Sequence, residues 1–238
     1  MDRLMHYIDV VKDALRFYKN LIVERSVGGY VALGALALVV LVVAIFMVIG
    51  YQRGESRETM RFLFTGVALV AAFFATCLIG RAGFFDRSIS SIIPLQKATL
   101  APLLDASFSV LLLPVVFVFV FLIFNLLLGI PHQLICGILG YTYRRNNGFT
   151  RFIGTFIGML HGLLISVLLL LPIFALVRPY ANIAKNPTED QKAPVSFYEH
   201  YLEETAESPL YRYTMRFGGD KLLNEIAEGN LADIVTKE

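Results

Sequence analysis

Four long stretches of the chain contain no Asp, Glu, Lys or Arg. They lie between the following pairs of charged residues: Arg25 and Arg53, Arg61 and Arg81, Asp105 and Arg144, and Arg151 and Arg178. A helix needs about 20 predominantly apolar residues to cross the hydrocarbon core of a membrane, and each stretch has this length, the second only just. Because the stretches are continuously apolar rather than alternating with a period of two, they do not fit a β-barrel. Lipid offers the backbone no hydrogen-bond partners, so each segment must be a helix.

The pattern therefore predicts an all-α integral membrane protein with four transmembrane helices, an N-terminal amphipathic helix and a short helical C-terminal tail. The expected spans cover about residues 28–50, 62–80, 108–130 and 152–177. In domain terms, residues 1–27 form the amphipathic helix, residues 28–178 the four-helix membrane domain, and residues 179–238 a polar acidic tail.

The N-terminal segment has one apolar stripe. Its apolar residues recur at alternating steps of four and three: Leu4, Ile8, Val11, Leu15, Tyr18 and Ile22. This spacing is typical of an amphipathic helix. The stripe would lie in the membrane interface or pack on the protein's own surface. A two-stranded coiled coil is disfavoured because three heptads are short for one.

Charge separates the tail from the rest of the chain. From Arg178 onward there are 7 Lys and Arg against 11 Asp and Glu, a net charge of −4, whereas residues 1–177 carry 14 against 8, a net charge of +6. The apolar residues of the tail predict two or three short amphipathic helices. These apolar residues are too few to form an independent core. We expect the tail to pack on the membrane domain or on a partner.

The connectors between the spans have distinct characters. Residues 51–61 are short, so the first two spans should form an antiparallel hairpin with a charged tip. Residues 81–107 are too polar to span and too apolar for a free loop, which favours an interfacial or re-entrant segment. The third span should end at Pro131, and residues 131–151 should turn at an Asn-Asn-Gly triplet. Pro172 should kink the fourth span near its end.

Small residues form a stripe on the fourth span. Gly154, Gly158, Gly162 and Ser166 are spaced four apart, which places them on one face of a helix. Such a stripe lets another backbone approach closely, and close packing is a main source of helix association in lipid. The same pattern serves packing inside one monomer and packing between the subunits of an oligomer, so both remain open.

His161 lies beside that stripe, inside the membrane. An ionisable residue at this depth is a functional hypothesis by default, here a polar path shared with Asn125 of the third span. The alternative is a neutral imidazole that is hydrogen-bonded across helices to Asn125. The expected spans contain no acidic residue to complete a proton relay, and this favours the structural interpretation.

Signatures of catalysis are missing from the sequence. Neither Gly-x-Ser-x-Gly nor His-Glu-x-x-His occurs, and no catalytic residue or cofactor is expected. Cys77 and Cys136 lie in apolar surroundings without ligand spacing, so we expect buried thiols and no metal site. Arg53 and Arg57, near the hairpin tip, suit lipid phosphates, although ordinary snorkelling would place them equally well.

Two stretches resemble the colicin V production protein (CvpA) family of bacterial inner-membrane proteins. The first covers residues 50–60 and is similar to the family's Arg-Gly-x-x-Arg-Glu hairpin tip, through Arg53, Gly54, Arg57 and Glu58. The second covers residues 149–162 and is similar to an arginine followed by glycines four apart, through Arg151, Gly154, Gly158 and Gly162. The similarity spans residues 28–178. Thr150 departs from the Asn or Asp usual in the family, and the N-terminal helix and the tail are additions.

The resemblance implies a multi-pass protein of the bacterial cytoplasmic membrane, of a kind required for toxin production or export and for envelope homeostasis, and it implies no known reaction. Because catalytic signatures are missing, we expect a non-enzymatic protein. Because the family's four-helix module is sometimes joined to an extracytoplasmic protease, the resemblance also favours external termini. The count of Lys and Arg near the spans, which is higher on the side of both termini, favours the opposite orientation. We expect the lipid bilayer as a partner, together with a homo-oligomer or another membrane protein, and no nucleic acid. Membrane assembly or scaffolding is the favoured role. A small oligomeric transporter or channel subunit, with His161 and Asn125 lining a polar path, is the alternative.

Overall fold

The computed structural model describes residues 2–82, 108–141, 147–185 and 192–228. Within these ranges every regular element is a helix, which confirms the all-α fold. The elements are α1 (Asp2–Glu24), α2 (Val27–Arg53), α3 (Glu55–Arg81), α6 (Phe108–Leu127), α7 (Gly129–Ile138), α8 (Gly148–Lys185), α9 (Lys192–Phe197), η2 (Tyr198–Leu202), α10 (Glu203–Glu207), α11 (Pro209–Thr214), η3 (Met215–Gly219) and α12 (Asp220–Glu228).

In the described part of the chain, four helical stretches are long and apolar enough to cross a membrane. They cover Val27–Arg53, Glu55–Gly80, Leu112–Ile138 and Gly148–Ala181. The number of spans agrees with the sequence pattern, but each span extends beyond the expected limits at one or both ends. The expected multi-pass membrane architecture is therefore confirmed, and its boundaries need correction.

The first hairpin is much tighter than the expected connector of residues 51–61. Gly54 alone separates α2 from α3, with φ 74° and ψ 175°. Glycine suits this backbone conformation because a side chain would be strained at such a positive φ. The helix α3 consequently includes Glu58 in its first turns. The expectation that no acidic residue lies in a span is wrong.

The third span does not end at Pro131. The helix α6 stops at Leu127, and α7 resumes the helical path at Gly129. Pro131 is the third residue of α7, where a helix tolerates a missing N–H group because the first turn has no intrahelical acceptor for it. The expected interfacial segment at 81–107 lies almost wholly outside the described residues.

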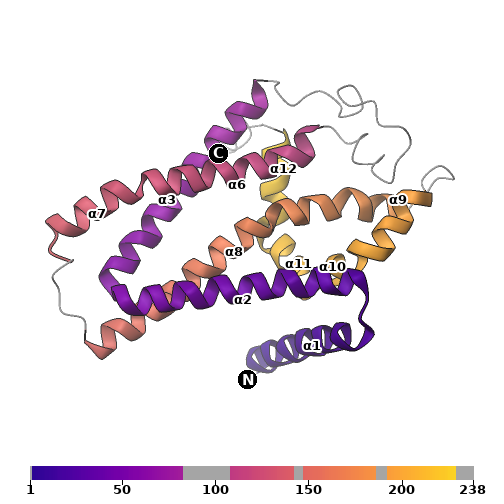
Figure 1. Cartoon of the computed structure of the whole chain (residues 1–238), viewed down its shortest axis with the longest axis horizontal. Coiled ribbons are helices and arrows are strands. Elements are labelled where there is room, and N and C mark those ends of the chain that lie inside the picture. Colours follow the sequence, from indigo (N-terminus) through magenta and orange to yellow (C-terminus); the bar gives the residue numbers. More distant parts are fainter. Residues whose placement is uncertain (1, 83–107, 142–146, 186–191, 229–238) are drawn as a thin grey trace.

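The helix α8 is the central element of the bundle. It begins after Asn147, whose side-chain Oδ1 accepts a hydrogen bond from the backbone N of Thr150 at 2.9 Å, as an N-cap residue does. It then continues through Pro172 and Pro179. Figure 1 shows α8 running beside α2, and α8 also packs against α3 and α6.

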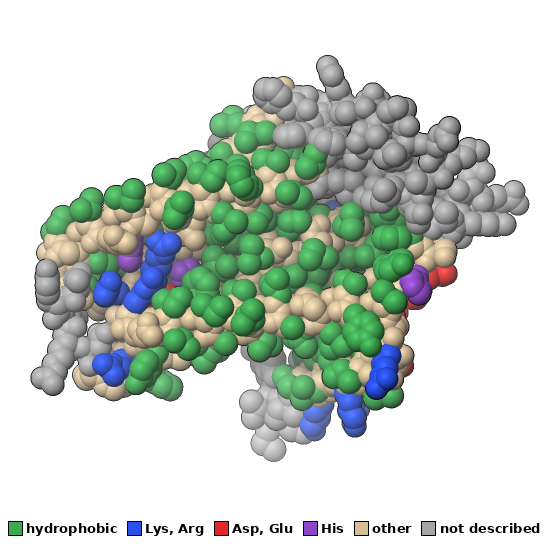
Figure 2. Space-filling view, in the orientation of Figure 1, with side chains coloured by type: hydrophobic (Ala, Val, Ile, Leu, Met, Phe, Trp, Pro, Cys, Tyr) green, Lys and Arg blue, Asp and Glu red, His purple; other side chains and the backbone are tan. Residues whose placement is uncertain are grey.

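One apolar core joins the membrane helices to the tail. Phe117 and Phe121 of α6 are buried against α3 and α8, and Leu223 and Ile226 of α12 belong to the same cluster. Apolar side chains also cover much of the outer surface, as Figure 2 shows, and Leu126 of α6 is 77% exposed. Exposed apolar side chains on spanning helices are what a lipid environment requires.

The helix α1 lies beside the start of α2 (Figure 1). Leu21 anchors it, with 4% of its surface exposed. The chain then reverses at Arg25, which has φ 53°, and Ser26 caps α2 by accepting a hydrogen bond from the backbone N of Gly29 at 2.9 Å. The N-terminal helix therefore packs on the protein's own surface near one end of the bundle.

Candidate functional site

The glycine stripe of α8 packs against α2 within the monomer. A Cβ atom added to Gly154 would overlap the backbone of Gly50, and one added to Gly158 would overlap the backbone oxygen of Phe46. A Cβ atom on Gly162 would lie 2.8 Å from the Cα atom of Val43. Only glycine lets the two backbones approach this closely. Of the two roles left open for the stripe, the structure uses it for packing inside one chain.

This close approach brings His161 against Glu58. The Nδ1 atom of His161 lies 2.8 Å from Oε1 of Glu58, and the two side chains are 1% and 0% exposed. Both residues were singled out from the sequence, but for different reasons and at different places. The structure joins the hairpin-tip motif of α3 to the intramembrane histidine of α8.

The pair is extended at both ends by further polar groups. Arg53 donates from Nη1 to Oε2 of Glu58 at 3.3 Å and is 36% exposed, so it links the buried carboxylate to the surface. On the other side, Nε2 of His161 lies 2.9 Å from Oγ1 of Thr65. The hydroxyl of Thr65 is in turn 3.3 Å from Oδ1 of Asn125. The sequence suggested a direct contact between His161 and Asn125, but Thr65 lies between the two side chains.

Arg61 of α3 joins this polar cluster to α6. Its Nη2 atom donates to the backbone oxygen of Asn125 at 3.3 Å. The residues Arg53, Glu58, Arg61, Thr65, Asn125 and His161, from α2, α3, α6 and α8, are called the polar cluster below. Figure 2 shows Lys and Arg side chains gathered at this end of the molecule, next to the histidines.

The hydroxyl of Thr65 gives the polar cluster two hydrogen-bond states. It has one hydrogen and lies within reach of three groups: the backbone oxygen of Arg61 at 3.0 Å, Asn125 and His161. If Thr65 donates to His161, the imidazole is neutral, with its hydrogen on the Nδ1 atom that faces Glu58. If Thr65 donates to either oxygen instead, Nε2 of His161 carries a hydrogen and donates it to the hydroxyl oxygen. A proton shift at His161 thus reorients one hydroxyl.

Packing fixes the imidazole ring in this position. The rings of Phe46 and Phe62 lie 4.6 Å and 5.8 Å from the ring of His161, centroid to centroid. A buried carboxylate is costly unless its oxygens are paired and hydrogen-bonded. Glu58 meets this condition with a partner on each oxygen. The polar cluster is therefore held in place by apolar rings and by its own hydrogen bonds.

A second polar group lies next to the cluster on α7. Nε2 of His132 faces the backbone oxygen of Arg57 at 3.4 Å and Sγ of Cys136 at 3.5 Å, and His132 and Cys136 are both buried. The Nε atom of Arg57 is buried without a hydrogen-bond partner among the described residues. The same ranges contain no group of three His, Cys, Asp or Glu side chains that could hold a metal ion. Cys77 is also buried.

Arg151 does not join the polar cluster. Its guanidinium lies over the ring of Tyr51, 5.4 Å from the centroid, at the surface of the α2–α8 contact. This geometry is a cation–π contact between the two stretches that carry the family resemblance.

Arg61 and Thr65 are the members of the polar cluster that sequence reasoning missed. Glu58, Arg61 and Thr65 recur at steps of three and four, which places them on one face of α3. This polar stripe would have been visible if the second span had been started at Glu55 rather than near residue 62.

No family model matches the chain, and neither a curated protein nor a solved structure matches it significantly. The functional argument therefore rests on the residues and their contacts.

Proposed function

We propose that the chain is a non-enzymatic, CvpA-like protein of the bacterial cytoplasmic membrane that acts in membrane assembly or scaffolding, in the context of toxin production or export and envelope homeostasis. We also propose that both termini lie on the external side of the membrane. One observation supports it most: the two stretches that carry the resemblance, residues 50–60 and 149–162, pack directly against each other. Gly54 contacts Gly154, and Glu58 contacts His161.

This contact explains why the residues that carry the resemblance occur together. Glycines bring α2 and α8 together, and the hairpin glycine Gly54 allows α3 to begin immediately, so that Glu58 reaches His161. Because the stripe is occupied inside the monomer, a partner has to bind elsewhere. The acidic tail and the lipid-facing helix surfaces are the regions that offer contacts for it.

Purification from gently solubilised native membranes, with the mass of the intact complex, tests the assembly role. We expect a second membrane protein in a fixed ratio to the tagged chain. The variant Gly158→Leu should lose this partner, because it separates α2 from α8. The variant Gly66→Leu is the matched control, since a Cβ atom on Gly66 meets nothing within 4 Å. A homo-oligomer without any partner would contradict the assembly role.

Sidedness is tested separately. Alkaline phosphatase fused to the C-terminus folds into an active enzyme only outside the cytoplasm, so we expect an active fusion. An inactive phosphatase fusion, with a fluorescent fusion at the same position, would place the termini inside.

A second candidate function is a proton-conducting transporter or channel subunit. The specific observation in its favour is the continuous series of polar contacts from Arg53 through Glu58 and His161 to Thr65 and Asn125. Transport pathways for protons usually chain several such groups within the membrane.

Proteoliposomes with a pH-sensitive dye inside test this second candidate. Proton uptake should exceed that of empty vesicles and should fall at least tenfold in Glu58→Gln, whereas Glu55→Gln, on the same turn region of α3, should leave it unchanged. Uptake equal to that of empty vesicles would remove the transport candidate and leave the assembly role untouched.

A further inference from the structure

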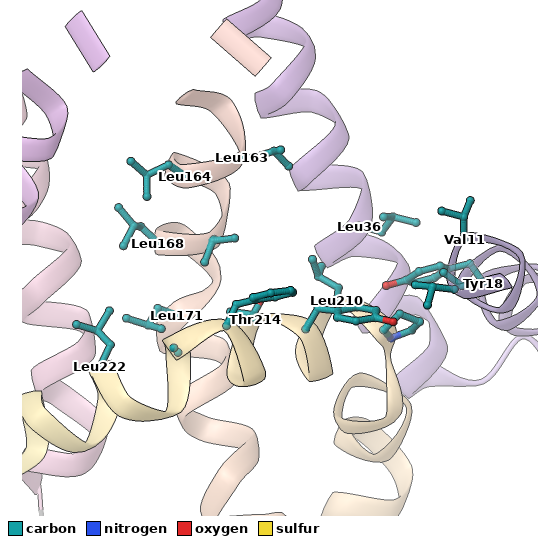
Figure 3. A pocket seen from close by; sticks show the side chains of 18 of the residues that line it. Val11, Tyr18, Leu36, Leu163, Leu164, Leu168, Leu171, Leu210, Thr214 and Leu222 are labelled. Atoms are coloured by element: carbon teal, nitrogen blue, oxygen red, sulfur yellow. The ribbon is translucent and has the colours of Figure 1, made fainter. Parts of the chain in front are cut away.

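A large apolar groove, with a volume of about 830 Å³, lies between α1, the middle of α8 and the tail. Figure 3 shows its walls: Val11 and Tyr18 come from α1, Leu163 and Leu168 from α8, and Leu210 from the tail. The volume falls in the range of about 300–1,000 Å³ that is usual for small-molecule sites. The residues of α8 lie inside a membrane span, so the groove is at a depth that lipid chains reach.

A smaller and more polar pocket adjoins the apolar groove. It has a volume of about 420 Å³. Val10, Ala14, Pro209 and Tyr213 line both spaces, so the two are neighbours that share walls. A ligand that occupies both would need an apolar body and a polar end.

The polar pocket contains both signs of charge. Asp13 of α1 and Glu207 of α10 supply two carboxylates, and Arg212 and Arg216 of the tail supply two guanidinium groups. Asp13 is also 3.8 Å from Arg16 of α1, in an exposed pair. Guanidinium groups bind phosphate oxygens through charge-assisted hydrogen bonds, and carboxylates accept hydrogen bonds from a primary ammonium.

This combination discriminates between phospholipid headgroups. Phosphatidylethanolamine carries one phosphate and one primary ammonium, which match the arginines and the carboxylates. Phosphatidylglycerol has no ammonium for Asp13 and Glu207, whose charges would oppose its own. Phosphatidylcholine has a quaternary ammonium that carries no hydrogen to donate.

We propose that the apolar groove and the polar pocket together bind one molecule of phosphatidylethanolamine. The acyl chains lie among the leucines of α8, and the headgroup lies between α1 and the tail. Val11 and Leu15 of α1 are 57% and 66% exposed beside the groove, and bound chains would cover them. The proposal goes beyond the assembly role and does not depend on it.

The binding experiment uses the full chain, purified in detergent and washed free of lipid. Phosphatidylethanolamine, phosphatidylglycerol and phosphatidylcholine with identical acyl chains are titrated in turn, and native mass spectrometry counts the lipids retained. We expect one retained phosphatidylethanolamine, with a preference of about tenfold over the other two, since a few partly exposed charge contacts contribute on this scale. Equal retention of all three would mean ordinary boundary lipid and would overturn the proposal, as would a preference for phosphatidylglycerol.

Variants assign the contacts. The double variant Arg212→Gln, Arg216→Gln should reduce retention of phosphatidylethanolamine to the level of phosphatidylcholine. Its matched control is Lys19→Gln, Lys221→Gln, which removes two exposed positive charges from α1 and the tail outside the lining and should retain the lipid. Unchanged binding in the arginine variant would overturn the headgroup assignment.

A second pair of substitutions guards against a folding defect in the arginine variant. Asp13→Asn with Glu207→Gln keeps both arginines and removes the negative charge, so it should bind phosphatidylglycerol at least as well as phosphatidylethanolamine. If this variant still prefers phosphatidylethanolamine to phosphatidylglycerol, the carboxylates do not bind the ammonium group and the proposal fails. Ala14→Phe, which fills the junction of the two spaces, should lower retention of every lipid tested.

Discussion

At the hairpin end of the bundle, glycines let the backbones of α2 and α8 touch, and Glu58 and His161 are buried between α3 and α8. On one side of the bundle, α1, the tail and the middle of α8 leave an apolar groove of about 830 Å³ between them. The first region buries charge behind tight packing, and the second leaves apolar surface uncovered.

The difference follows from what each kind of group needs in a membrane. A buried carboxylate such as Glu58 requires fixed partners on both oxygens, and close packing supplies them because it holds His161 and Arg53 in place. Apolar side chains such as Leu163 need no partner, since lipid chains can cover them. Tight packing is therefore necessary at the hairpin end and dispensable at the groove.

The largest expected effect comes from separating α2 and α8. Gly158→Leu inserts a side chain where the backbone oxygen of Phe46 lies, so the packed hairpin end cannot form. We expect a loss of more than about 3 kcal/mol in the free energy of unfolding, beyond ordinary overpacking, and little folded protein. Thermal unfolding in detergent measures it. Gly66→Leu should unfold near the wild-type temperature, and equal behaviour of the two variants would refute the contact.

The next effect concerns the buried pair. His161→Ala leaves the carboxylate of Glu58 buried without its closest partner, and leaving a buried charged group unsatisfied typically costs about 3 kcal/mol or more. The double variant Glu58→Gln, His161→Ala should be more stable than His161→Ala alone, because no buried charge remains. Chemical denaturation of the single and double variants measures the coupling. Additive effects would show that the two side chains do not interact.

A smaller effect is expected in the tail. Ile226 of α12 is 0% exposed and packs in the core shared with α3 and α6. Ile226→Ala should reduce the free energy of unfolding by about 2 kcal/mol, at the lower end of the range for such truncations, because one wall of the core is a short helix that can relax. Limited proteolysis should then cut the tail before the membrane helices. Lys221→Ala, on the exposed side of the same helix, should leave the cleavage pattern unchanged.

The smallest expected effect is a dependence of tail packing on pH. Partial burial raises the pKa of Glu203, and the negative charges of Glu207, Glu204 and Glu199 raise it further. A raised pKa means that folding favours the protonated form. The contribution to stability is therefore full below the ordinary carboxyl pKa of 4.5 and is lost as the pH rises through the folded-state pKa.

Proteolysis of the tail across this pH range checks the sign. Cleavage should become faster as the pH rises, and Glu203→Gln should flatten the dependence. Glu225→Gln, on α12 outside this acidic group, is the matched control and should keep the wild-type dependence. A tail that becomes more resistant with rising pH would contradict the prediction.

The sequence predicted the membrane fold because hydrophobic length is a local property. Each span contains enough consecutive apolar residues to require a helix, whatever packs beside it, as α2 and α8 illustrate. The helix ends were less predictable, since charge marks the edge of the apolar run and not the end of the helix. Glu58 shows this: the charge suggested a loop, but the residue lies within α3.

The partners of the site residues depended on tertiary structure. The glycine spacing indicated a packing face on α8 but could not say that α2 fills it. His161 on its own favoured a neutral imidazole hydrogen-bonded to Asn125, whereas the structure places it directly against Glu58. Residues 58 and 161 are far apart in the sequence, and no local pattern relates them.

By itself, then, the sequence determined that this chain crosses a membrane four times as helices and which faces could pack, because both follow from the apolar length and the helical period. Only the tertiary structure decided that Glu58, His161 and Thr65 form one polar cluster and that α1 and the tail enclose a groove. Those features arise from contacts between distant segments, whose distances depend on how glycines and side chains of several helices fit together at once.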